Sequence, residues 1–589
     1  MKISTDWLQK YFEKPLPSVE VIADAFTFHS FEIDGVEGNI LDVKVLPNRA
    51  ADCLSHRGIA KDLSAILNIP IKYDPFREPL EVFPTTDKLT VEVDSDYVLR
   101  HTGALVKGVK VGASPAWLKD ALESLGQRSI NNVVDVLNFV LLDIGQPSGA
   151  FDVGKMELEN GVVKINIRRA KTGEKITTLT GEEYTLTEEM FTFTDAVGGS
   201  LLDIAGIKGG LTSGVTESTT DLFISVGNYD GTLIRKASQK LKLFTDASQR
   251  YQNRPTPELT AYGMHAILAL LKQVAGGELV GVVDVYPKKP AQSAPVIVSL
   301  IRINAILGAD FKESEVTDVL RRLDLPTTVA GTVFTVTPPF ERTDITLPED
   351  IVEEVGRILG YDRVQAVELS STEAVDQAKF RGIERVKDFL VERGFTEVST
   401  QSFAKKGEVW LANPLDKTKP ALRTTLAENL KEALLKAKLY APITVAPNVE
   451  SKVFEVGTVF SKDSERIAVQ TSEPVPDIPE IAPDGDFVPK RYVLSPYKPF
   501  SLYPFIVRDV AFWAPDTTDV ESTRSNIMQN AGPMLVRCTL FDTFSKEGRT
   551  SFAFRLVFQS DESTLTDEEA NGWMASVTLW LTSQGWEVR

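Results

Sequence analysis

The pattern of apolar and polar positions along the chain predicts a mixture of strands and helices. Apolar residues alternate with polar ones over 89–93 ("LTVEV") and 162–170 ("VVKINIRRA"), the period of two that is typical of half-buried strands. They recur at helical spacing over 59–67 ("IAKDLSAIL") and 312–323 ("KESEVTDVLRRL"). Both periods return in several regions, so the pattern predicts an α+β multidomain protein.

Two proline-rich stretches separate regions of different pattern and predict linkers, 285–295 ("VYPKKPAQSAP") and 473–489 ("EPVPDIPEIAPDGDFVP"). Over 506–584 the pattern reads strand, helix, strand, strand, helix. This order predicts a small α+β sandwich with its helices on one face of an antiparallel sheet. The five expected domains are 1–85, 86–285, 293–365, 366–480 and 495–589.

Composition narrows the class of protein. A chain of 589 residues is too long for one core, and 43% hydrophobic with 25% charged residues is typical of soluble globular proteins. The net charge of −18 argues against non-specific nucleic-acid binding through the overall field. Two cysteines far apart and four scattered histidines argue against a disulfide scaffold or a zinc site. No signal peptide or membrane-spanning run is predicted, so we expect a cytoplasmic location.

The stretch 340–362 ("FERTDITLPEDIVEEVGRILGYD") combines a helical apolar stripe with a group of carboxylates. The stripe is Ile351, Val355, Ile358 and Leu359, and the carboxylates are Asp344, Asp350, Glu353 and Glu354. Thr346 and Glu349 fit a capping box around Pro348, and acidic residues are favoured in a first helical turn. The same oxygens also suit Mg²⁺. Two interpretations therefore stay open, a capped amphipathic helix and a magnesium site.

Other motifs carry little chemistry by themselves. The chain has no GxxxxGK[ST] loop, no HExxH and no GxSxG. The glycine-rich stretch 209–214 ("GGLTSG") is compatible with an anion-binding loop, although a tight turn is the commoner explanation. No Ser/His/Asp or Cys/His triad can be assembled from the four histidines.

Several stretches together resemble one family, the beta subunits of bacterial-type phenylalanine–tRNA ligase. They follow the order of that family and run from end to end of the chain. The stretches are "VKVLPNRAADCLSHRGIAKDLSAIL", "SINNVVDVLNFVLLDIGQPSGAFD", "AGIKGG", "FTDASQRY", "TPPFERTDITLPEDIVEEVGRILGYD", "LRTTL", "FEVGTVF" and "SFAFRLVFQSDESTLTDEEAN".

The resemblance implies an editing-like (B3/B4) mixed domain, a small α+β B5 domain with the acidic helix, a degenerate class II synthetase-like domain with an antiparallel sheet and no catalytic motifs, and a ferredoxin-like anticodon-binding domain. It implies an α2β2 assembly that attaches phenylalanine to tRNA(Phe) with ATP, and the aminoacylation site would lie in the alpha subunit. Neither DNA nor a membrane is an expected partner. In this family the acidic helix coordinates Mg²⁺, so the resemblance favours the metal interpretation of Asp344, Asp350, Glu353 and Glu354.

The first departure from the family pattern lies near the N-terminus. Bacterial members usually carry an oligonucleotide-binding fold after the first segment. Here "FEIDGVEGN" runs directly into "ILDVKVLPNRA", which leaves no room for that domain. The C-terminal domain would then be the main contact of this chain with tRNA.

The second departure lies in the editing-like region, where the family hydrolyses tyrosine wrongly attached to tRNA. The pocket positions that match are Arg128, Asn138, Gly209, Thr245 and Ala247. Gly149 stands where the family has histidine, and Ser225 where it has glutamate. Glycine has no side chain to orient water, and serine carries no charge. Editing is therefore predicted to be weak or lost. The alternative functions are a free-standing hydrolase of mischarged tRNA and a non-enzymatic RNA-binding or assembly protein.

Overall fold

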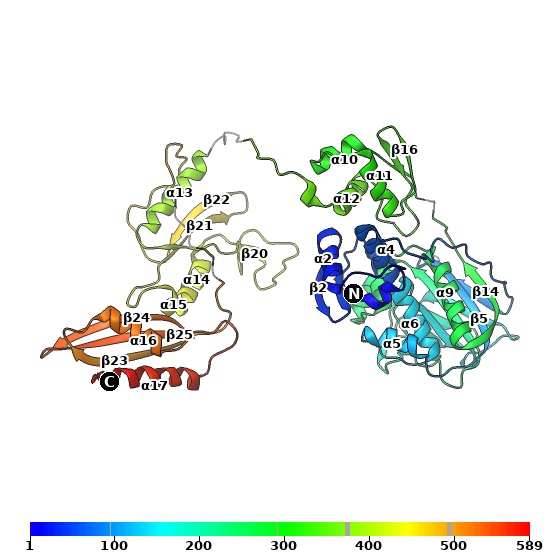
Figure 1. Ribbon diagram of the computed structural model, residues 1–589, viewed down its shortest axis with the longest axis horizontal. Coiled ribbons are helices and arrows are strands. Elements are labelled where there is room, and N and C mark those ends of the chain that lie inside the picture. The colour runs from blue at the N-terminus through cyan, green and yellow to red at the C-terminus, as the bar shows by residue number, and fades with distance from the viewer. Residues whose placement is uncertain (95, 291–292, 371–376, 492–495, 498) are drawn as a thin grey trace. The chain divides into compact units, whose positions relative to one another are not determined.

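The computed structural model describes residues 1–94, 96–290, 293–370, 377–491, 496–497 and 499–589 (Figure 1). Residues 291–292, in the first predicted linker, lie outside this range, as do 371–376 in the predicted fourth domain. The chain forms two compact units, Met1–Glu368 and Leu369–Arg589. None of the helices among the described residues is both long and apolar enough to cross a membrane.

The N-terminal segment is a three-stranded antiparallel sheet, in the order β1-β3-β2, with helices packed against it. Gly38, with φ +56°, and Asn39 form the two-residue turn between β2 and β3. A hairpin this tight holds no inserted domain, as the sequence predicted. The elements are β1 (Lys2–Ser4), α1 (Thr5–Gln9), α2 (Val19–His29), β2 (Glu32–Glu37), β3 (Ile40–Lys44), α3 (Ala50–Cys53) and α4 (His56–Leu67).

The next region contains a five-stranded sheet of order β12-β11-β10-β7-β4, a four-stranded sheet of order β14-β5-β13-β6 and a two-stranded sheet of β8 and β9. Helix α6 begins where the Asn131 side chain accepts hydrogen bonds from the amides of Val133 and Val134, and ends at Gly145, whose φ of +83° stops the helix. Helix α9 packs against α6 and against β5, β13 and β14. The strands are β4 (Leu89–Val93), β5 (Val98–Val109), β6 (Ser148–Asp152), β7 (Val163–Arg169), β8 (Lys175–Thr177), β9 (Glu183–Thr185), β10 (Phe191–Asp195), β11 (Leu201–Ile204), β12 (Lys208–Gly209), β13 (Leu222–Tyr229) and β14 (Gly276–Val285). The helices are α5 (Ala116–Ser124), α6 (Asn132–Ile144), η1 (Val153–Lys155), α7 (Gly231–Leu241), α8 (Asp246–Gln252) and α9 (Leu259–Val274).

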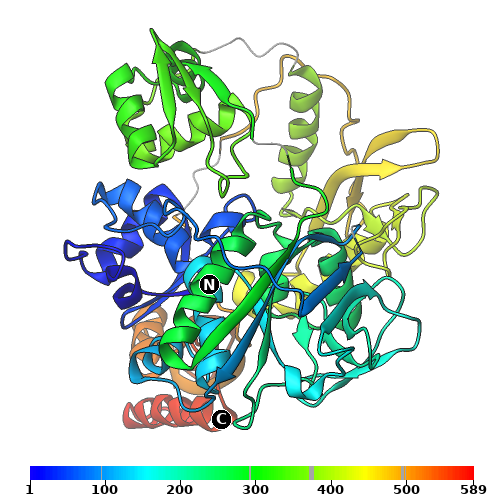
Figure 2. The ribbon, with the colours of Figure 1, turned by 90° about the vertical axis from the view of Figure 1, so that its right-hand side faces the viewer.

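The first unit ends in a small antiparallel sheet, of order β15-β17-β16, beside three helices (Figure 2). Helix α12 is amphipathic, and Ile351, Val355 and Ile358 of the predicted stripe are buried. The elements are β15 (Val296–Ser299), α10 (Leu300–Leu307), α11 (Glu313–Arg322), β16 (Thr327–Ala330), β17 (Val333–Val336), α12 (Pro348–Leu359) and η2 (Tyr361–Arg363).

The second unit begins with a reduced sheet of order β18-β21-β22. Strands β21 and β22 are antiparallel, but β18 pairs in parallel with β21, so this sheet is mixed rather than wholly antiparallel as expected. The elements are α13 (Ala378–Val391), β18 (Thr396–Glu397), β19 (Phe403–Ala404), β20 (Ala421–Leu422), α14 (Ala427–Leu439), α15 (Ala441–Thr444), β21 (Val453–Phe460) and β22 (Glu465–Thr471).

The chain ends in a four-stranded antiparallel sheet of order β24-β25-β23-β26, against which α16 and α17 pack. The chain order β-α-β-β-α-β is that of a ferredoxin-like fold, which confirms the prediction for this segment and adds a final short strand. The elements are β23 (Ile506–Pro515), α16 (Val520–Asn530), β24 (Leu535–Lys546), β25 (Arg549–Phe558), α17 (Asp567–Ser583) and β26 (Glu587–Val588). The α+β multidomain class is confirmed.

Candidate functional site

The acidic helix α12 starts one residue later than the predicted capping box. The Asp350 carboxylate accepts hydrogen bonds from the amides of Leu347 and Thr346, both at 2.7 Å. Asp350 therefore caps the helix, and Pro348 occupies its first turn as predicted. The expected box of Thr346 with Glu349 is wrong, because Glu349 instead accepts from Arg302 Nε at 3.1 Å.

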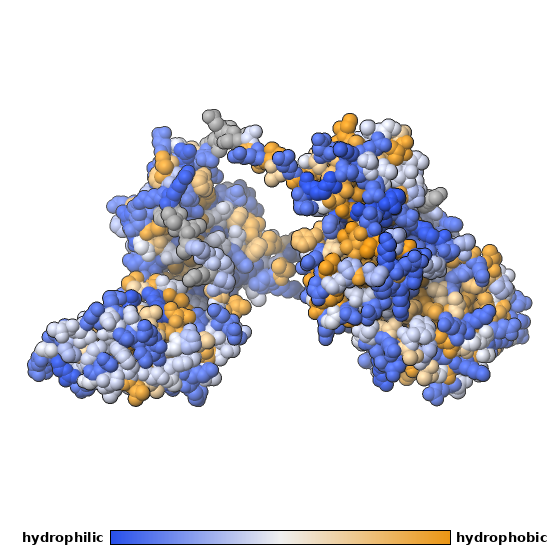
Figure 3. All heavy atoms as spheres, viewed as in Figure 1, coloured by the Kyte–Doolittle hydropathy of each residue, from blue (hydrophilic) through white to orange (hydrophobic). Residues whose placement is uncertain are grey.

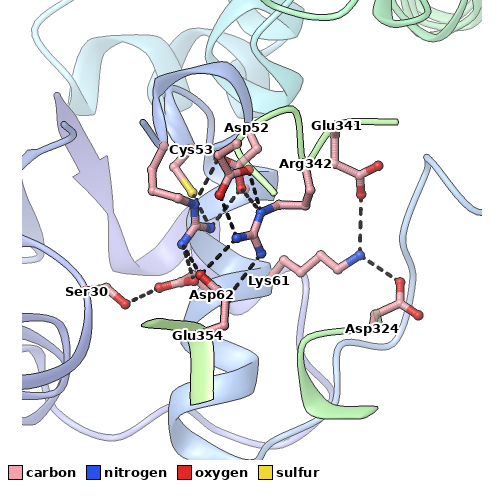
Figure 4. A network of polar contacts seen from close by, with 12 residues as sticks. Ser30, Asp52, Cys53, Lys61, Asp62, Asp324, Glu341, Arg342 and Glu354 are labelled. Carbon is pink, nitrogen blue, oxygen red and sulfur yellow. Dashed lines mark hydrogen bonds and ion pairs between the residues drawn. The ribbon is translucent and has the colours of Figure 1, made fainter. Parts of the chain in front are cut away.

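Two of the other predicted metal ligands are held by arginine side chains, and Figure 4 shows one of them, Glu354, together with Arg342. Glu354 is buried, and its carboxylate lies 2.7 Å from an Arg357 nitrogen and 2.9 Å from an Arg342 nitrogen. Asp344 accepts two hydrogen bonds from Arg342, at 2.9 and 2.8 Å. This fork-to-fork geometry is the strong form of a carboxylate–guanidinium pair.

The same arginines belong to a network that joins α12 to the N-terminal segment. Asp62, on α4, lies 2.8 Å from Arg357 and 3.1 Å from Arg49. Arg49 also pairs with Asp52 at 2.8 Å. We call this group the arginine–carboxylate network. Its members are Arg49, Asp52, Asp62, Arg342, Asp344, Glu354 and Arg357.

The electrostatics of the network favour ionised carboxylates. Burial by itself would raise the pKa of Glu354, but the positive charges of Arg342, Arg357 and Arg49 outweigh it and hold that pKa well below its ordinary value. Burial would likewise raise the pKa of Asp62, and the guanidinium groups of Arg357 and Arg49 lower it. Glu354 and Asp62 are therefore charged and already neutralised at pH 7.

The predicted magnesium ligands do not come together as one site. Asp344 and Glu354 face guanidinium groups, Asp350 caps the helix, and Glu353 is exposed. Among the described residues, no group of three or more His, Cys, Asp or Glu side chains is placed to hold a metal ion. Because arginines already supply the positive charge here, these four residues in this arrangement do not fit Mg²⁺.

Sequence motifs do not identify Arg49, Asp62 or Arg357 as partners of the acidic helix. One feature of the sequence could have indicated the network. Asp62 is a charged residue beside three apolar residues of the same helix, Ile59, Ala60 and Leu63, which are all fully buried. Buried charges are paired in folded proteins, so Asp62 had to have a basic partner. The identity of that partner depends on tertiary contacts.

The second candidate site is a pocket of about 90 Å³ in the region of β6, β10, β11 and β13. Four predicted positions line it, namely Gly149, Ser225, Gly209 and Ala247. The other three positions are absent from its lining. Arg128 is exposed, Asn138 is half-buried on α6, and Thr245 caps α8 while donating its hydroxyl hydrogen bond to the Ile207 carbonyl at 2.9 Å.

The two departures from the family pattern lie side by side in this pocket, because Ser225 of β13 is paired with Gly149 of β6. A Cβ atom added to Gly149 would lie 3.1 and 3.3 Å from two ring carbons of Phe151. Phe151 therefore occupies the space that a side chain at 149 needs. The Ser225 hydroxyl lies 2.9 Å from His101 Nε2, and burial lowers the pKa of that histidine to about 3.

Three family models match parts of the chain. They are the B3/4 domain over residues 98–276, the tRNA synthetase B5 domain over 296–361 and the ferredoxin-fold anticodon binding domain over 501–589. The phenylalanine–tRNA ligase beta subunit of Clostridium acetobutylicum is 31% identical in an alignment that covers 91% of this chain and 78% of that protein. The chain belongs to the phenylalanine–tRNA ligase beta-subunit family.

Other relatives agree with this membership. The phenylalanine–tRNA ligase beta subunit of Aquifex aeolicus is 30% identical over 92% of this chain and 78% of its own length. A crystal structure of an N-terminal fragment of the beta subunit from Pyrococcus horikoshii covers 61% of this chain at 17% identity and a TM-score of 0.35, which is too low to support a comparison of folds. The family places the pocket in its B3/4 domain and helix α12 in its B5 domain.

Proposed function

We propose that the chain is the beta subunit of a phenylalanine–tRNA ligase and supports ATP-dependent attachment of phenylalanine to tRNA(Phe). The observation that carries this proposal is the 31% identity to a beta subunit over 91% of the chain. The aminoacylation site would lie in the alpha subunit of an α2β2 assembly. This placement of the aminoacylation site in the alpha subunit agrees with the sequence of this chain, which has no GxxxxGK[ST] phosphate-binding loop. ATP and Mg²⁺ would be used by the assembled enzyme.

The domain bounds proposed from the sequence stay close to the family matches. We infer domains at 1–85, 86–285, 293–365, 366–480 and 495–589. The three family models fall inside the second, third and fifth of these. The match to a ferredoxin-fold anticodon binding domain supports a tRNA contact through the last domain.

An alpha-subunit interface on the second unit is supported by apolar side chains that this unit leaves uncovered (Figure 3). Trp410 is 62% exposed, and Leu435 and Leu439 lie on α14 with 62% and 66% exposed. Leu435 and Leu439 are four residues apart and share one face of α14, and an exposed apolar face of this kind is typical of a protein interface. We propose that this surface contacts the alpha subunit.

Aminoacylation is the direct test of the subunit proposal. We expect this chain alone to show no phenylalanylation of tRNA(Phe), and its mixture with an alpha subunit encoded in the same genome to show activity. The alpha subunit alone serves as the control. A stable complex with no activity in the mixture, or activity of this chain alone, would contradict the proposal. Size-exclusion chromatography with light scattering reports the complex independently.

We further propose that editing of tyrosyl-tRNA by this chain is weak or lost. The pocket has no imidazole or carboxylate at Gly149 and Ser225, the two positions where the family pattern has histidine and glutamate. These two departures argue against a free-standing hydrolase of mischarged tRNA.

Restoring histidine at position 149 is expected to leave deacylation of tyrosyl-tRNA unchanged. Gly149→His alone would press against the Phe151 ring, which lies within 3.1 Å of the added Cβ atom. The triple variant Gly149→His, Phe151→Ala and Ser225→Glu makes room for the imidazole and supplies both the imidazole and the carboxylate. Recovered deacylation of tyrosyl-tRNA is therefore expected in the triple variant and not in Gly149→His. Gly149→Ala is the matched control for crowding. A wild-type rate as high as that of editing-proficient relatives would overturn the proposal of lost editing.

A further inference from the structure

A cavity of about 740 Å³ lies beside helix α9. Its walls come mainly from residues 73–83, from α9 and from the start of β14, all within the unit Met1–Glu368. It shares no lining residue with the pocket of Gly149 and Ser225. Because cavities of roughly 300–1,000 Å³ are the size that holds a small organic ligand, this second hollow is large enough to be a binding site.

One wall of the cavity belongs to the connection between α4 and β4, and we call residues 74–84 the strap. The Asp74 carboxylate accepts a hydrogen bond from Arg57 Nε at 2.9 Å, which fixes the first end. The carbonyl of the last strap residue accepts from the Val282 amide at 2.8 Å, which fixes the other. Between these ends, residues 78–83 form no backbone–backbone hydrogen bond with any described residue. Side chains, rather than backbone pairing, therefore hold this part of the strap across the cavity.

The base of the cavity is apolar, and part of its wall is aromatic. Val106, Ile144 and Leu271 line it and are buried. The Phe83 ring of the strap lines it as well and stacks on the His265 ring of α9, with the ring centroids 4.1 Å apart. Aliphatic and aromatic side chains of this kind favour a ligand with an apolar body, and aromatic faces also attract cations.

The charged side chains of the same lining are mostly carboxylates. Glu78, Glu81 and Glu278 are exposed, and none of them forms an ion pair with a described residue. Lys272 contributes one positive charge, and burial lowers the pKa of His265, which is therefore neutral at pH 7. The lining thus carries three negative charges against one positive charge at pH 7, and its electrostatics favour a cation.

We propose that this cavity binds a small organic cation with an apolar body, an arylalkylammonium or alkylammonium ion, between the strap and helix α9. The apolar body would lie on the buried base, and the ammonium group would lie among the carboxylates of the lining. A neutral molecule of the same shape would gain the apolar contacts alone, and an anion would meet an excess of negative charge. The proposal does not depend on the ligase function, because that function was inferred without these residues.

Three probes of matched shape test the preference for a cation. They are 2-phenylethylammonium, 2-phenylethanol and 3-phenylpropionate, and calorimetry measures their binding to the full chain without an alpha subunit. We expect the ammonium ion to bind, the alcohol to bind about 10-fold more weakly, and the carboxylate to show no binding. Equal affinity for the ammonium ion and the alcohol, or no binding of the ammonium ion, would overturn the proposal.

Removing the carboxylates of the lining tests their role. The triple variant Glu78→Gln, Glu81→Gln and Glu278→Gln should weaken binding of 2-phenylethylammonium by about 10-fold and abolish the preference over 2-phenylethanol. These side chains are exposed and make no ion pairs among the described residues, so the variant should keep the unfolding temperature of the wild type. Glu92→Gln is the matched control, because Glu92 is an exposed carboxylate of β4 outside the lining. An unchanged affinity of the triple variant would contradict the proposed charge pairing.

A pair of tryptophan variants tests where the cation binds. Ala269 lines the cavity from an exposed position of α9, so Ala269→Trp should fill the cavity and abolish binding of 2-phenylethylammonium. Gln273→Trp, at an exposed position of the same helix outside the lining, should bind as the wild type does. Hydrogen exchange of residues 78–83 should become slower when the wild-type chain binds the probe, and should not change in Ala269→Trp. Undiminished binding by Ala269→Trp would place the cation elsewhere, including the B3/4 pocket, and overturn the proposal.

Discussion

Replacing Arg342 with methionine is expected to destabilise the unit Met1–Glu368 by about 3–5 kcal/mol. Arg342 is buried and pairs with both Asp344 and Glu354. Methionine fills much of the same volume but removes the bidentate partner of Asp344 and one of the cations around Glu354, which keeps Arg357. Most of the loss then comes from carboxylates that lose a partner within a buried network, since an intact buried pair adds little net stability by itself.

Hydrogen exchange of α4 and α12 in the full chain measures this effect, because the network joins these two helices. Arg302→Met is the matched control. It also removes an arginine that pairs with a carboxylate of α12, Glu349, but both side chains are about half exposed and stability should change far less. Equal protection in the two variants would mean that the network contributes no more than a surface pair.

The contrast between α12 and its network shows what local sequence can predict. Helical spacing correctly predicted the helix and the buried face of Ile351, Val355 and Ile358, because neighbouring residues set this pattern. Counting carboxylates suggested a cation site, and the local sequence carries no information on Arg49, which lies about three hundred residues earlier. Tertiary packing brings the arginines that neutralise Glu354 next to its carboxylate.

The B3/4 pocket shows a second limit of prediction from sequence. Gly149 and Ser225 could be identified by comparison with the family pattern, but Asp203 could not. In β11 the residues Leu202 and Ile204 are buried in the core, so the alternation of a strand assigns Asp203 to the opposite face. That face normally meets solvent. Here Asp203 lines the same pocket as Gly149 of β6 and Ser225 of β13, which only the folded structure reveals.

Arg423→Met is expected to destabilise the unit Leu369–Arg589 by about 3–5 kcal/mol. Arg423 and Glu455 form an ion pair of 2.8 Å with side chains that are 5% and 3% exposed. The Thr400 hydroxyl donates to the same Glu455 carboxylate at 2.7 Å. Arg423 also donates to the Thr458 carbonyl at 2.9 Å, so one side chain connects three segments of the unit.

The effect of Arg423→Met should be confined to its own unit. Its partners Thr400, Glu455 and Thr458 all lie within Leu369–Arg589, so hydrogen exchange of α4 and α12 in the other unit should not change. Lys452→Met is the matched control, because Lys452 pairs with Glu473 at 2.6 Å with both side chains more than a third exposed. If this unit is the scaffold for an alpha subunit, Arg423→Met should also reduce recovery of the complex, whereas Lys452→Met should not. A destabilised unit that still recovers the complex in full would place the alpha-subunit contact elsewhere on the chain.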